Sequence, residues 1–271
     1  YPFDTFPAHF LAKCWRAVNI YEVHDLWPLS PIELGGYSRF NPAIILTQAF
    51  ENYAYRSVDV VVSLLPLAES YMRSKGLSKG KFYYIPNGIV ASEWGEKIGH
   101  STEIITKIND LAKNRFVVGY AGAHGLANAL DSFIEAASRM PEVVFVMVGN
   151  RPEKSRLMVK AASLENVLFF DSASKTDIPS ILGRMDALYL GLQRQSLFRF
   201  GISPNKLMDY LMAGKPIICA IEAGNDIVSQ ANCGYSIEPE DPGQIVDAIR
   251  KLMKMTIQER NRLGENGKRY V

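Results

Sequence analysis

The chain of 271 residues is poor in cysteine and in net charge. Its three cysteines, Cys14, Cys219 and Cys233, lie far apart, and no CxxC pair is present. Such a set predicts neither a disulfide framework nor a cysteine-ligated metal site, and it fits a reducing, cytoplasmic compartment. The net charge is only +2, and long basic runs are missing. The balance of charge therefore argues against nucleic acid as a partner.

Long apolar runs and common nucleotide-binding signatures are missing too. The longest apolar candidate, VDVVVSLLPLA at residues 58–68, falls short of the roughly 18 residues that span a bilayer, so we expect no transmembrane segment. No GxxxxGK[ST] loop occurs, and Gly119, Gly122 and Gly125 do not form GxGxxG. ATP hydrolysis and classical NAD binding lose support.

What the chain does have, from residue 115 onward, is a regular alternation of short apolar runs and segments of helical period. We expect strands at 116–121, 143–148, 167–170, 186–190, 216–220 and 235–237, and helices at 127–139, 153–163, 177–184, 204–213, 224–231, 241–254 and 256–269. Apolar strands that alternate with helices predict a parallel sheet covered on both faces, which is the doubly wound α/β fold.

The N-terminal part predicts a second, smaller α/β unit. Strands are expected near 19–24, 58–64 and 82–86, and helices at about 4–17 and 41–57. The turn IPNGI then suggests a boundary, giving domains at 1–92 and 93–271. Three strands are few for a doubly wound domain, and the chain begins at Tyr1, so we expect this domain to be incomplete and the chain to be part of a longer protein.

One feature is shared by the two parts. An aspartate opens a strand in each, in RSVDVVVS at Asp59 and in GRMDALYL at Asp186. The echo hints at two similar folds, although an aspartate that simply ends a helix-to-strand loop explains each case adequately.

The strongest candidate site is the segment GISPNKLMDYLMAGKP. Ser203 is expected to cap a helix and Pro204 to occupy its first turn, so that free backbone donors and Lys206 can bind a phosphate. Asn205 and Asp209 are four residues apart and share a helix face, where a carboxylate can accept hydrogen bonds from ribose hydroxyls. Complementarity to the helix dipole is an equally good explanation of Asp209 alone.

Other loops at the carboxyl ends of predicted strands offer weaker candidates. Gly122 would allow a diphosphate to approach the backbone closely, and His124 could donate to a ligand oxygen, although a histidine on a surface loop is the commoner finding. The next two loops, GNRPEK and DSASKTD, offer Asn150, Arg151 and Ser172 to a base or a ribose. Plain solvated turns explain those two loops equally well.

In the smaller domain, YEVHDLWP ends a strand with His24 and Asp25. A neutral histidine there could take a proton or bind a sugar hydroxyl. Asp25 is a candidate to orient it, although neighbours on a strand point to opposite faces.

Together, YEVHDLWP, YYIPNGI, GYAGAHGLANALDSFIEAA, KTDIPSIL and above all GISPNKLMDYLMAGKPII resemble the retaining GT-B glycosyltransferases of family four, in particular bacterial enzymes that add amino sugars to O-antigen or capsule oligosaccharides. The resemblance covers nearly the whole chain. It implies two Rossmann-like domains, a nucleotide-sugar held mainly by the C-terminal one, and neither a metal nor a separate cofactor. It assigns Asp209 to the ribose, Pro204 to Lys206 to the diphosphate, and His24 to the sugar and acceptor.

The chain departs from that family at three positions. The first glutamate of the E-x7-E pattern falls at Gly201, and the two cations of the loop after the first strand of the C-terminal domain fall near Ala123 and Asn128. The neutralising charge for a diphosphate must then come from Lys206, helped by Arg199 or Arg194 in the loop before it.

The resemblance implies transfer of a sugar, with retention, from a UDP-linked HexNAc or deoxy-HexNAc to a glycan or a polyprenyl-linked acceptor in surface-polysaccharide biosynthesis. His24 and Lys206 would be the catalytic residues. The basic segment IRKLMKMTIQERNRLGENGKR could add a peripheral contact with the inner membrane, although its pattern also fits a plain solvated helix. Two alternatives stay open: a nucleotide-sugar 2-epimerase, and a donor-binding module without turnover.

Overall fold

The computed structural model describes residues 2–94 and 102–271, and these divide into two compact units. The first unit comprises the chain up to Asn87 together with residues 195–203 and 223–225, and the second comprises the remainder from Gly88. The main division therefore falls shortly before the boundary that the sequence predicts after residue 92. The two short returns of the chain to the first unit hold no strand and only a single 3-10 turn, so they leave no periodic signal in the sequence.

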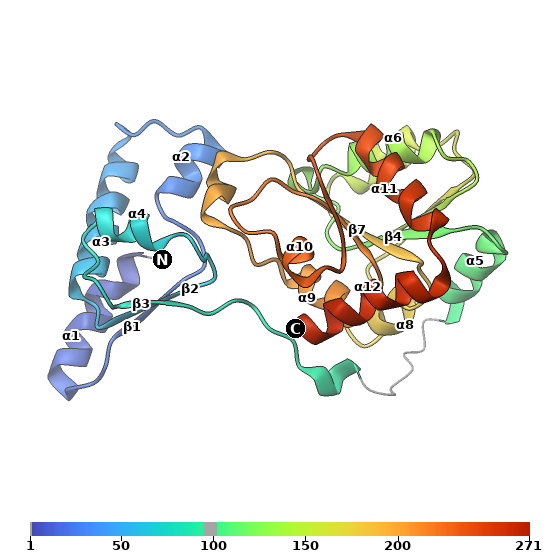
Figure 1. Cartoon of the computed structure of the whole chain (residues 1–271). Helices are drawn as coiled ribbons and strands as arrows, with labels where there is room; N and C mark the ends of the chain where they lie inside the picture. Colours follow the sequence, from blue (N-terminus) through green and yellow to red (C-terminus); the bar gives the residue numbers. More distant parts are fainter. Residues whose placement is uncertain (1, 95–101) are drawn as a thin grey trace. The chain divides into compact units, whose positions relative to one another are not determined.

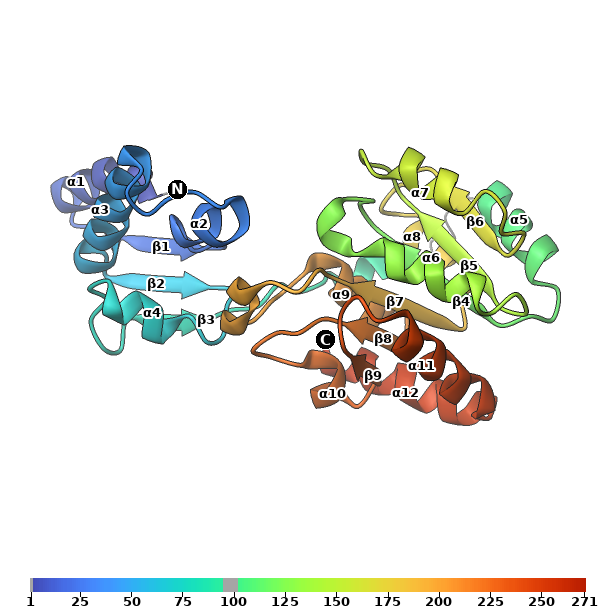
Figure 2. The ribbon, with the colours of Figure 1, turned by 90° about the horizontal axis from the view of Figure 1, so that it is seen from above.

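The first unit holds a parallel three-stranded sheet in the order β1-β2-β3 (Figures 1 and 2). Its elements are β1 (Ile20–Val23), β2 (Val60–Ser63), β3 (Phe82–Tyr84), α1 (Thr5–Trp15), α2 (Leu29–Gly35), α3 (Pro42–Ser57), α4 (Glu69–Ser74) and the 3-10 turns η1 (Pro2–Asp4) and η4 (Ser196–Phe200). All three strands and the helices α1 and α3 lie where the sequence predicts them. The sequence does not reveal α2 and α4, because seven and six residues make fewer than two full turns and show no helical period.

The second unit holds a parallel six-stranded sheet in the order β6-β5-β4-β7-β8-β9 (Figure 1). Its strands are β4 (Val117–Ala121), β5 (Val144–Val148), β6 (Val167–Phe170), β7 (Ala187–Gly191), β8 (Ile217–Ala220) and β9 (Gly234–Ile237). Its helices are α5 (Thr102–Ala112), α6 (Leu130–Ser138), α7 (Lys154–Lys160), α8 (Ile178–Leu182), α9 (Asn205–Met212), α10 (Ile227–Ala231), α11 (Pro242–Lys254) and α12 (Ile257–Tyr270), with the 3-10 turns η2 (Ala91–Trp94) and η3 (Leu126–Asn128). The predicted doubly wound α/β fold is confirmed.

Two apolar cores cover the faces of this sheet. One core joins the sheet to α6, α7 and α11, and the other joins it to α5, α8, α9 and α10. Figure 1 shows α6 and α11 on one side of β4 and β7, and α8 and α12 on the other. The central strands β4, β5 and β7 are buried at every residue, which explains why they read as continuous apolar runs.

Some helices in both units begin at a side-chain cap. The Asn41 carboxamide oxygen accepts from the amide of Ala43 at 2.9 Å to start α3, and Thr256 forms a capping box with Glu259 at the start of α12. These contacts satisfy backbone N–H groups that have no partner within the helix.

The aspartate that opens a strand plays the same part in each unit. The Asp59 carboxylate accepts from the amide of Asn19 at 2.9 Å, and the Asp186 carboxylate accepts from the amide of Val117 at 2.9 Å. In return, each aspartate donates its own amide to the carbonyl of the same partner, at 3.0 and 2.8 Å. Each aspartate thus pins the start of its strand to the neighbouring strand, which is a more specific role than ending a loop.

Within the described residues, none of the helices combines the length and the apolar character that a bilayer crossing requires.

Candidate functional site

The second sheet has its topological switch point between β4 and β7. From β4 the chain continues to β5 and β6 on one side, and the later strands β7, β8 and β9 lie on the other side. In open α/β sheets a ligand binds in the crevice beyond the carboxyl ends of the strands at such a point. The loop after β4 and the segment that leads into α9 both belong to this region.

Tyr210 of α9 fills the place where these two strands separate. β4 and β7 pair only at Val118 with Ala187 and at Gly119 with Leu188. Beyond that pair, the buried Tyr210 hydroxyl accepts from the amide of Ala121 at 2.8 Å and donates to its carbonyl at 3.1 Å. One side chain therefore satisfies both backbone groups of the last β4 residue, and it holds the first turns of α9 at the switch point.

Lys206 lies one helical turn before Tyr210, on the same face of α9. Its ammonium donates to the Tyr120 hydroxyl at 3.1 Å and to the Asn128 carboxamide oxygen, and it lies 5.1 Å from the centre of the Tyr120 ring. Among the described residues no carboxylate pairs with it. Burial lowers the pKa of Lys206 to about 8, because removal from water disfavours the charged form. The site thus presents a partly buried cation whose charge the protein does not neutralise.

The position of Asn128 explains how the missing loop cation is replaced. The family that the sequence resembles has a cation near this position. Here the Lys206 ammonium lies against the side-chain oxygen of Asn128 instead. The Asn128 amide nitrogen donates in turn to the Ala123 carbonyl at 3.0 Å. Gly122 lies beside the same lysine, since a Cβ on this glycine would sit 3.5 Å from the Lys206 Cε.

The expected start of the helix is wrong by one residue. Pro204 is the N-cap, in an extended conformation and without a side-chain cap, and α9 begins at Asn205. Ser203 does not cap the helix, because its hydroxyl accepts from the amide of Asn87 at 2.9 Å within the first unit. The first turn is therefore Asn205, Lys206 and Leu207, and its backbone donors receive no cap from Ser203.

Asn205 and Asp209 keep the placement that their spacing predicts. Asn205 is exposed at the first position of α9, and Asp209 is half-buried one turn later. The carboxylate therefore lies on the helix that carries Lys206, within two turns of its N-terminus.

His124 is fully buried, which contradicts the reading of it as a surface-loop histidine. Its exposed fraction is 0 %, and neither ring nitrogen has a hydrogen-bond partner among the described residues. The ring lies between Tyr120 and Phe169, with centroid distances of 5.9 and 6.2 Å. Burial, together with the charges of Lys154 and Lys206, lowers the pKa of His124 to about 4. It is a neutral ring with unused hydrogen-bonding capacity beside the switch point.

The loops after β4 and β5 approach each other closely. The amide of Gly122 donates to the Val148 carbonyl at 2.9 Å, and the amide of His124 donates to the Asn150 carbonyl at 2.9 Å. A Cβ on Gly149 would lie 1.9 Å from the Gly122 carbonyl oxygen, so only glycine fits there. These contacts fix the backbone of the β4 loop next to Lys206.

Three further candidates lie in the loops that follow β5 and β6. The Asn150 side-chain oxygen accepts from Lys154 at 3.1 Å, and Lys154 also pairs with Asp171 at 2.5 Å, so this set ties the loops after β5 and β6 together. Arg151 and Ser172 are both exposed. For these two, solvated turns remain as good an explanation as ligand contacts.

The candidates His24 and Arg199 belong to the first unit, and the candidate Arg194 belongs to the second. The His24 side chain is 61 % exposed in the first unit, and its Nε2 lies 2.8 Å from a Glu22 oxygen, so its polar partner is not Asp25.

Both arginines have carboxylate partners among the described residues. The Arg199 guanidinium binds both oxygens of Glu33, at 2.7 and 2.8 Å. Arg194 pairs with Glu222 and Glu238, each at 2.5 Å. Lys206 is thus the cation of this group that lacks a carboxylate partner in the described part of the chain.

The absence of a carboxylate at Gly201 has a steric reason. Gly201 has a φ of +95°, and a Cβ there would lie 2.5 Å from the Cδ of Pro66 in the same unit. A glutamate would therefore require both a strained backbone and a displaced proline.

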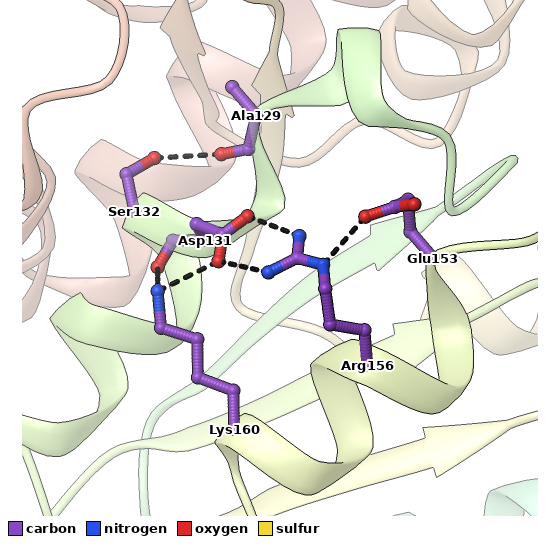
Figure 3. A network of polar contacts seen from close by, with 6 residues as sticks. All are labelled: Ala129, Asp131, Ser132, Glu153, Arg156 and Lys160. Atoms are coloured by element: carbon purple, nitrogen blue, oxygen red, sulfur yellow. Dashed lines mark hydrogen bonds and ion pairs between the residues drawn. The ribbon is translucent and has the colours of Figure 1, made fainter.

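A network of charged side chains braces the helix that follows the β4 loop (Figure 3). The Asp131 carboxylate on α6 accepts from both terminal nitrogens of Arg156, at 2.8 and 2.6 Å, and from Lys160 at 2.8 Å on α7. Glu153 holds the other side of Arg156 at 2.7 Å. These bonds lower the pKa of Asp131 well below its usual range.

Two tyrosines of the site, Tyr120 and Tyr210, are not among the candidates that the sequence offers. Their hydroxyl groups carry the contacts that matter, to Lys206 and to Ala121. The available signal was the spacing of four residues between Lys206 and Tyr210, which places both on one helix face.

Comparisons with known proteins agree with this architecture. The family model described as "Glycosyl transferases group 1" matches residues 101–270. The glycosyl transferase WcaI of Escherichia coli (strain K12), provisionally named for colanic acid biosynthesis, is 24% identical over 253 residues, which are 90% of this chain and 62% of WcaI. The chain thus spans less than two thirds of the length of this relative.

Solved structures show the same fold at low identity. HepE of Anabaena, crystallised with UDP and glucose, is 17% identical with a TM-score of 0.71, over 99% of this chain and 70% of that one. WaaG, a glycosyltransferase involved in lipopolysaccharide biosynthesis, is 20% identical with a TM-score of 0.67, over 93% of this chain and 70% of that one. These likenesses confirm the GT-B type of α/β fold. Since the family model covers well over half of the residues, the chain belongs to the glycosyl transferases of group 1.

Proposed function

We propose that the second unit binds the nucleoside diphosphate of a sugar donor and that the protein transfers this sugar to an acceptor. Lys206 is the observation that carries the proposal. A partly buried ammonium without a carboxylate partner is costly unless an anion joins it, and it lies at the switch point of the sheet, beside a helix N-terminus.

The neighbouring groups suit the remainder of such a donor. The Asp209 carboxylate, within two turns of the start of α9, would accept from the ribose hydroxyls, and Asn205 would add a further polar contact. His124 would gain the hydrogen-bond partner that it lacks if a ligand or an ordered water reached its ring. As the diphosphate departs, Lys206 and the first amides of α9 would stabilise the developing negative charge.

The finer features are part of the same proposal. UDP is favoured as the carrier because the similarly folded HepE was crystallised with UDP and glucose. An amino sugar as donor, retention of configuration, independence of metal, and a glycan or polyprenyl-linked acceptor follow from the family that the sequence resembles. So does a cytoplasmic site of action with peripheral contact to the inner membrane. The names of WcaI and WaaG support a role in surface-polysaccharide biosynthesis.

Binding is tested first, because it depends on the second unit alone. UDP and UDP-sugars should raise the melting temperature and give a saturable calorimetric signal, with GDP and ADP counterparts as comparison. Lys206→Ala should weaken UDP binding, and Lys254→Ala, which removes an exposed cation from the end of α11, should leave it unchanged. An equal response of the two variants would refute the site.

Turnover is a separate measurement. With acceptor present, Lys206→Ala should reduce kcat far more than donor affinity, because its charge acts most strongly on the departing diphosphate. Equal losses would limit Lys206 to binding. Binding without turnover would support the donor-binding module. Conversion of UDP-GlcNAc to a ManNAc product without acceptor would establish epimerisation in place of transfer.

A further inference from the structure

Two uncharged oxygens of the second unit hold the ammonium of Lys206. An ammonium has three N–H donors, and here two of them bind the Tyr120 hydroxyl, at 3.1 Å, and the Asn128 side-chain oxygen. Both acceptors are buried, with exposed fractions of 0 % and 9 %. One N–H of the ammonium therefore has no partner among the residues that the structure describes.

A shared partner fixes the direction of both hydrogen bonds. The Tyr120 hydroxyl donates its single hydrogen to the Ala123 carbonyl at 2.7 Å, and the Asn128 amide nitrogen donates to the same carbonyl at 3.0 Å. Because an ammonium cannot accept, a lone pair of the hydroxyl and the oxygen of the carboxamide must face Lys206. Hydrogen bonds in such a chain polarise one another. Lys206, Tyr120, Ala123 and Asn128 thus form a closed hydrogen-bonded cycle.

The backbone that carries this cycle is braced. Tyr120 lies on the buried strand β4, and Asn128 ends the 3-10 turn η3. The Ala127 carbonyl of that turn accepts from the amide of Gln193 at 2.9 Å. A lysine side chain loses rotamer freedom when it is fixed, and the cycle fixes Lys206 before a ligand binds. Such preorganisation reduces the entropic cost of binding.

Neither acceptor neutralises the charge that it holds. Burial raises the pKa of the Tyr120 hydroxyl well above its ordinary value, so this oxygen stays uncharged, and the Asn128 carboxamide does not titrate. The titratable side chain on which Lys206 acts is His124, which is neutral. An aspartate at position 128 would have the same shape as Asn128 but would form an ion pair with the ammonium. The amide therefore fixes the cation and leaves its charge available.

We propose that Tyr120 and Asn128 are positioning residues of the donor site. They hold the Lys206 ammonium by two N–H groups, so that the third N–H and the full charge are available to an anionic oxygen of the ligand. The inference rests on the proposed function for the identity of that anion, a nucleoside diphosphate. The role of the cycle in holding Lys206 can be tested without any ligand.

The first test titrates Lys206 in the free protein. The NMR chemical shift of its Cε, assigned by its loss in Lys206→Arg, should follow the pKa of about 8. Asn128→Asp should raise the midpoint by about one to three pH units, because a nearby carboxylate favours the charged form. Tyr120→Phe should lower the midpoint, because the charged form loses an acceptor.

Matched controls make the same substitutions elsewhere in the second unit. Asn261→Asp adds a carboxylate at an exposed position of α12, and Tyr189→Phe removes a buried hydroxyl whose contact with Ser132 is 3.5 Å long. Neither control should move the midpoint of Lys206. Midpoints that also stay unchanged in Asn128→Asp and Tyr120→Phe would overturn the positioning role.

UDP calorimetry gives a second readout. Asn128→Asp should weaken UDP binding about tenfold or more, and Tyr120→Phe about threefold to tenfold. Tyr120→Phe should also move the loss of UDP affinity to a pH below 8, whereas a loss of equal size at every pH would limit Tyr120 to a structural role. If UDP does not bind the parent protein, the proposed function fails, and the titration of Lys206 still decides whether the cycle positions this cation.

Discussion

At the scale of single residues, Lys206 is a cation whose pKa lies close to neutral pH. Burial holds its pKa at about 8, so the free protein loses this charge as the pH rises above 8. An anionic ligand binds the charged form, and protonating a neutral lysine costs about 1.4 kcal/mol per pH unit. The charge at the site is therefore available at physiological pH but not far above it.

We therefore expect UDP affinity to fall by up to about tenfold per pH unit above pH 8. Calorimetric titration between pH 7 and 10 measures this slope. Lys206→Arg is the matched variant, because a guanidinium stays charged throughout that range. Its profile should be flat even if its absolute affinity is lower. A flat profile in the parent protein would show that this ammonium does not contact the ligand.

His124 should lower the free energy of unfolding at acidic pH. Its pKa in the folded state is about 4, below the ordinary value of 6.5, so the unfolded chain takes up a proton first. The contribution of the neutral His124 ring to the free energy of unfolding is fully present above pH 6.5. It is lost as the pH falls toward 4, by up to about 3 kcal/mol.

His124→Phe should remove this part of the acid dependence without a cavity, because Phe has a similar shape and leaves no unsatisfied nitrogen. Urea denaturation at pH 7.5 and 4.5 measures the difference. Identical losses in both proteins would contradict the assignment. If UDP affinity at pH 7.5 also falls in the variant, His124 contributes to the ligand site as well as to the pH response.

Residues whose role is local can be found from the sequence. Lys206, Asn205 and Asp209 follow from spacing on one helix, and the structure keeps that spacing. The role of Ser203 cannot be found in this way, because its partner Asn87 is 116 residues away. The burial of His124 is not visible in the sequence either, where a surface-loop histidine is the commoner expectation. Whether a loop side chain is buried depends on residues far along the chain, such as Phe169. The pattern of residues in the loop itself carries no information on them.

At the scale of elements, Asp131 adds ion pairs to the contact between α6 and α7. Asp131→Asn should destabilise the protein by about 1 kcal/mol, since exposed ion pairs are individually weak and this carboxylate serves two cations. The effect should diminish in 1 M NaCl, where screening acts within roughly 3 Å. Glu135→Gln, which removes a carboxylate paired with Arg139 alone, is the control and should cost less. A larger loss in the control would show that the network adds nothing.

Most elements with a strong period could be predicted closely, and short elements could not. One exception is α5, whose eleven residues were not predicted as a helix. The strand at Val167–Phe170 matches its predicted bounds, and the long helices α3 and α11 start within one residue of theirs. The short helices α2 and α4 were not predicted, although both line a cavity of about 640 Å³ in the first unit. That cavity was therefore invisible in the sequence, because its walls come from elements without a periodic signature.

At the scale of the whole molecule, the two units should respond to pH in opposite directions. Glu51 is 1 % exposed in the first unit, and burial raises its pKa to about 7. The contribution of Glu51 to the free energy of unfolding is then fully present below pH 4.5, the pKa of the carboxyl in the unfolded chain. It is lost as the pH rises through 7, by up to about 3 kcal/mol. His124 gives the second unit the reverse trend.

Differential scanning calorimetry at pH 5 and pH 8 should therefore show two transitions that shift in opposite senses. Glu51→Gln should abolish the shift of the first unit only. A glutamine can keep all three neighbours, because its oxygen accepts from Tyr71 and Gln48 while its nitrogen donates to the Tyr55 hydroxyl. A single transition that moves in one direction would refute the independent responses.

The Tyr210 hydroxyl lies where β4 and β7 separate, and its hydrogen bond makes the Ala121 amide a reporter of the docking of α9. The Ala121 amide hydrogen bonds to Tyr210 and not to a strand, so its exchange with deuterium should follow the opening of α9, while its neighbours on β4 follow the sheet. Tyr210→Phe should speed exchange at this single amide, and UDP bound at Lys206 should slow it. A probe of nucleotide occupancy is thus present in the native chain without any added label.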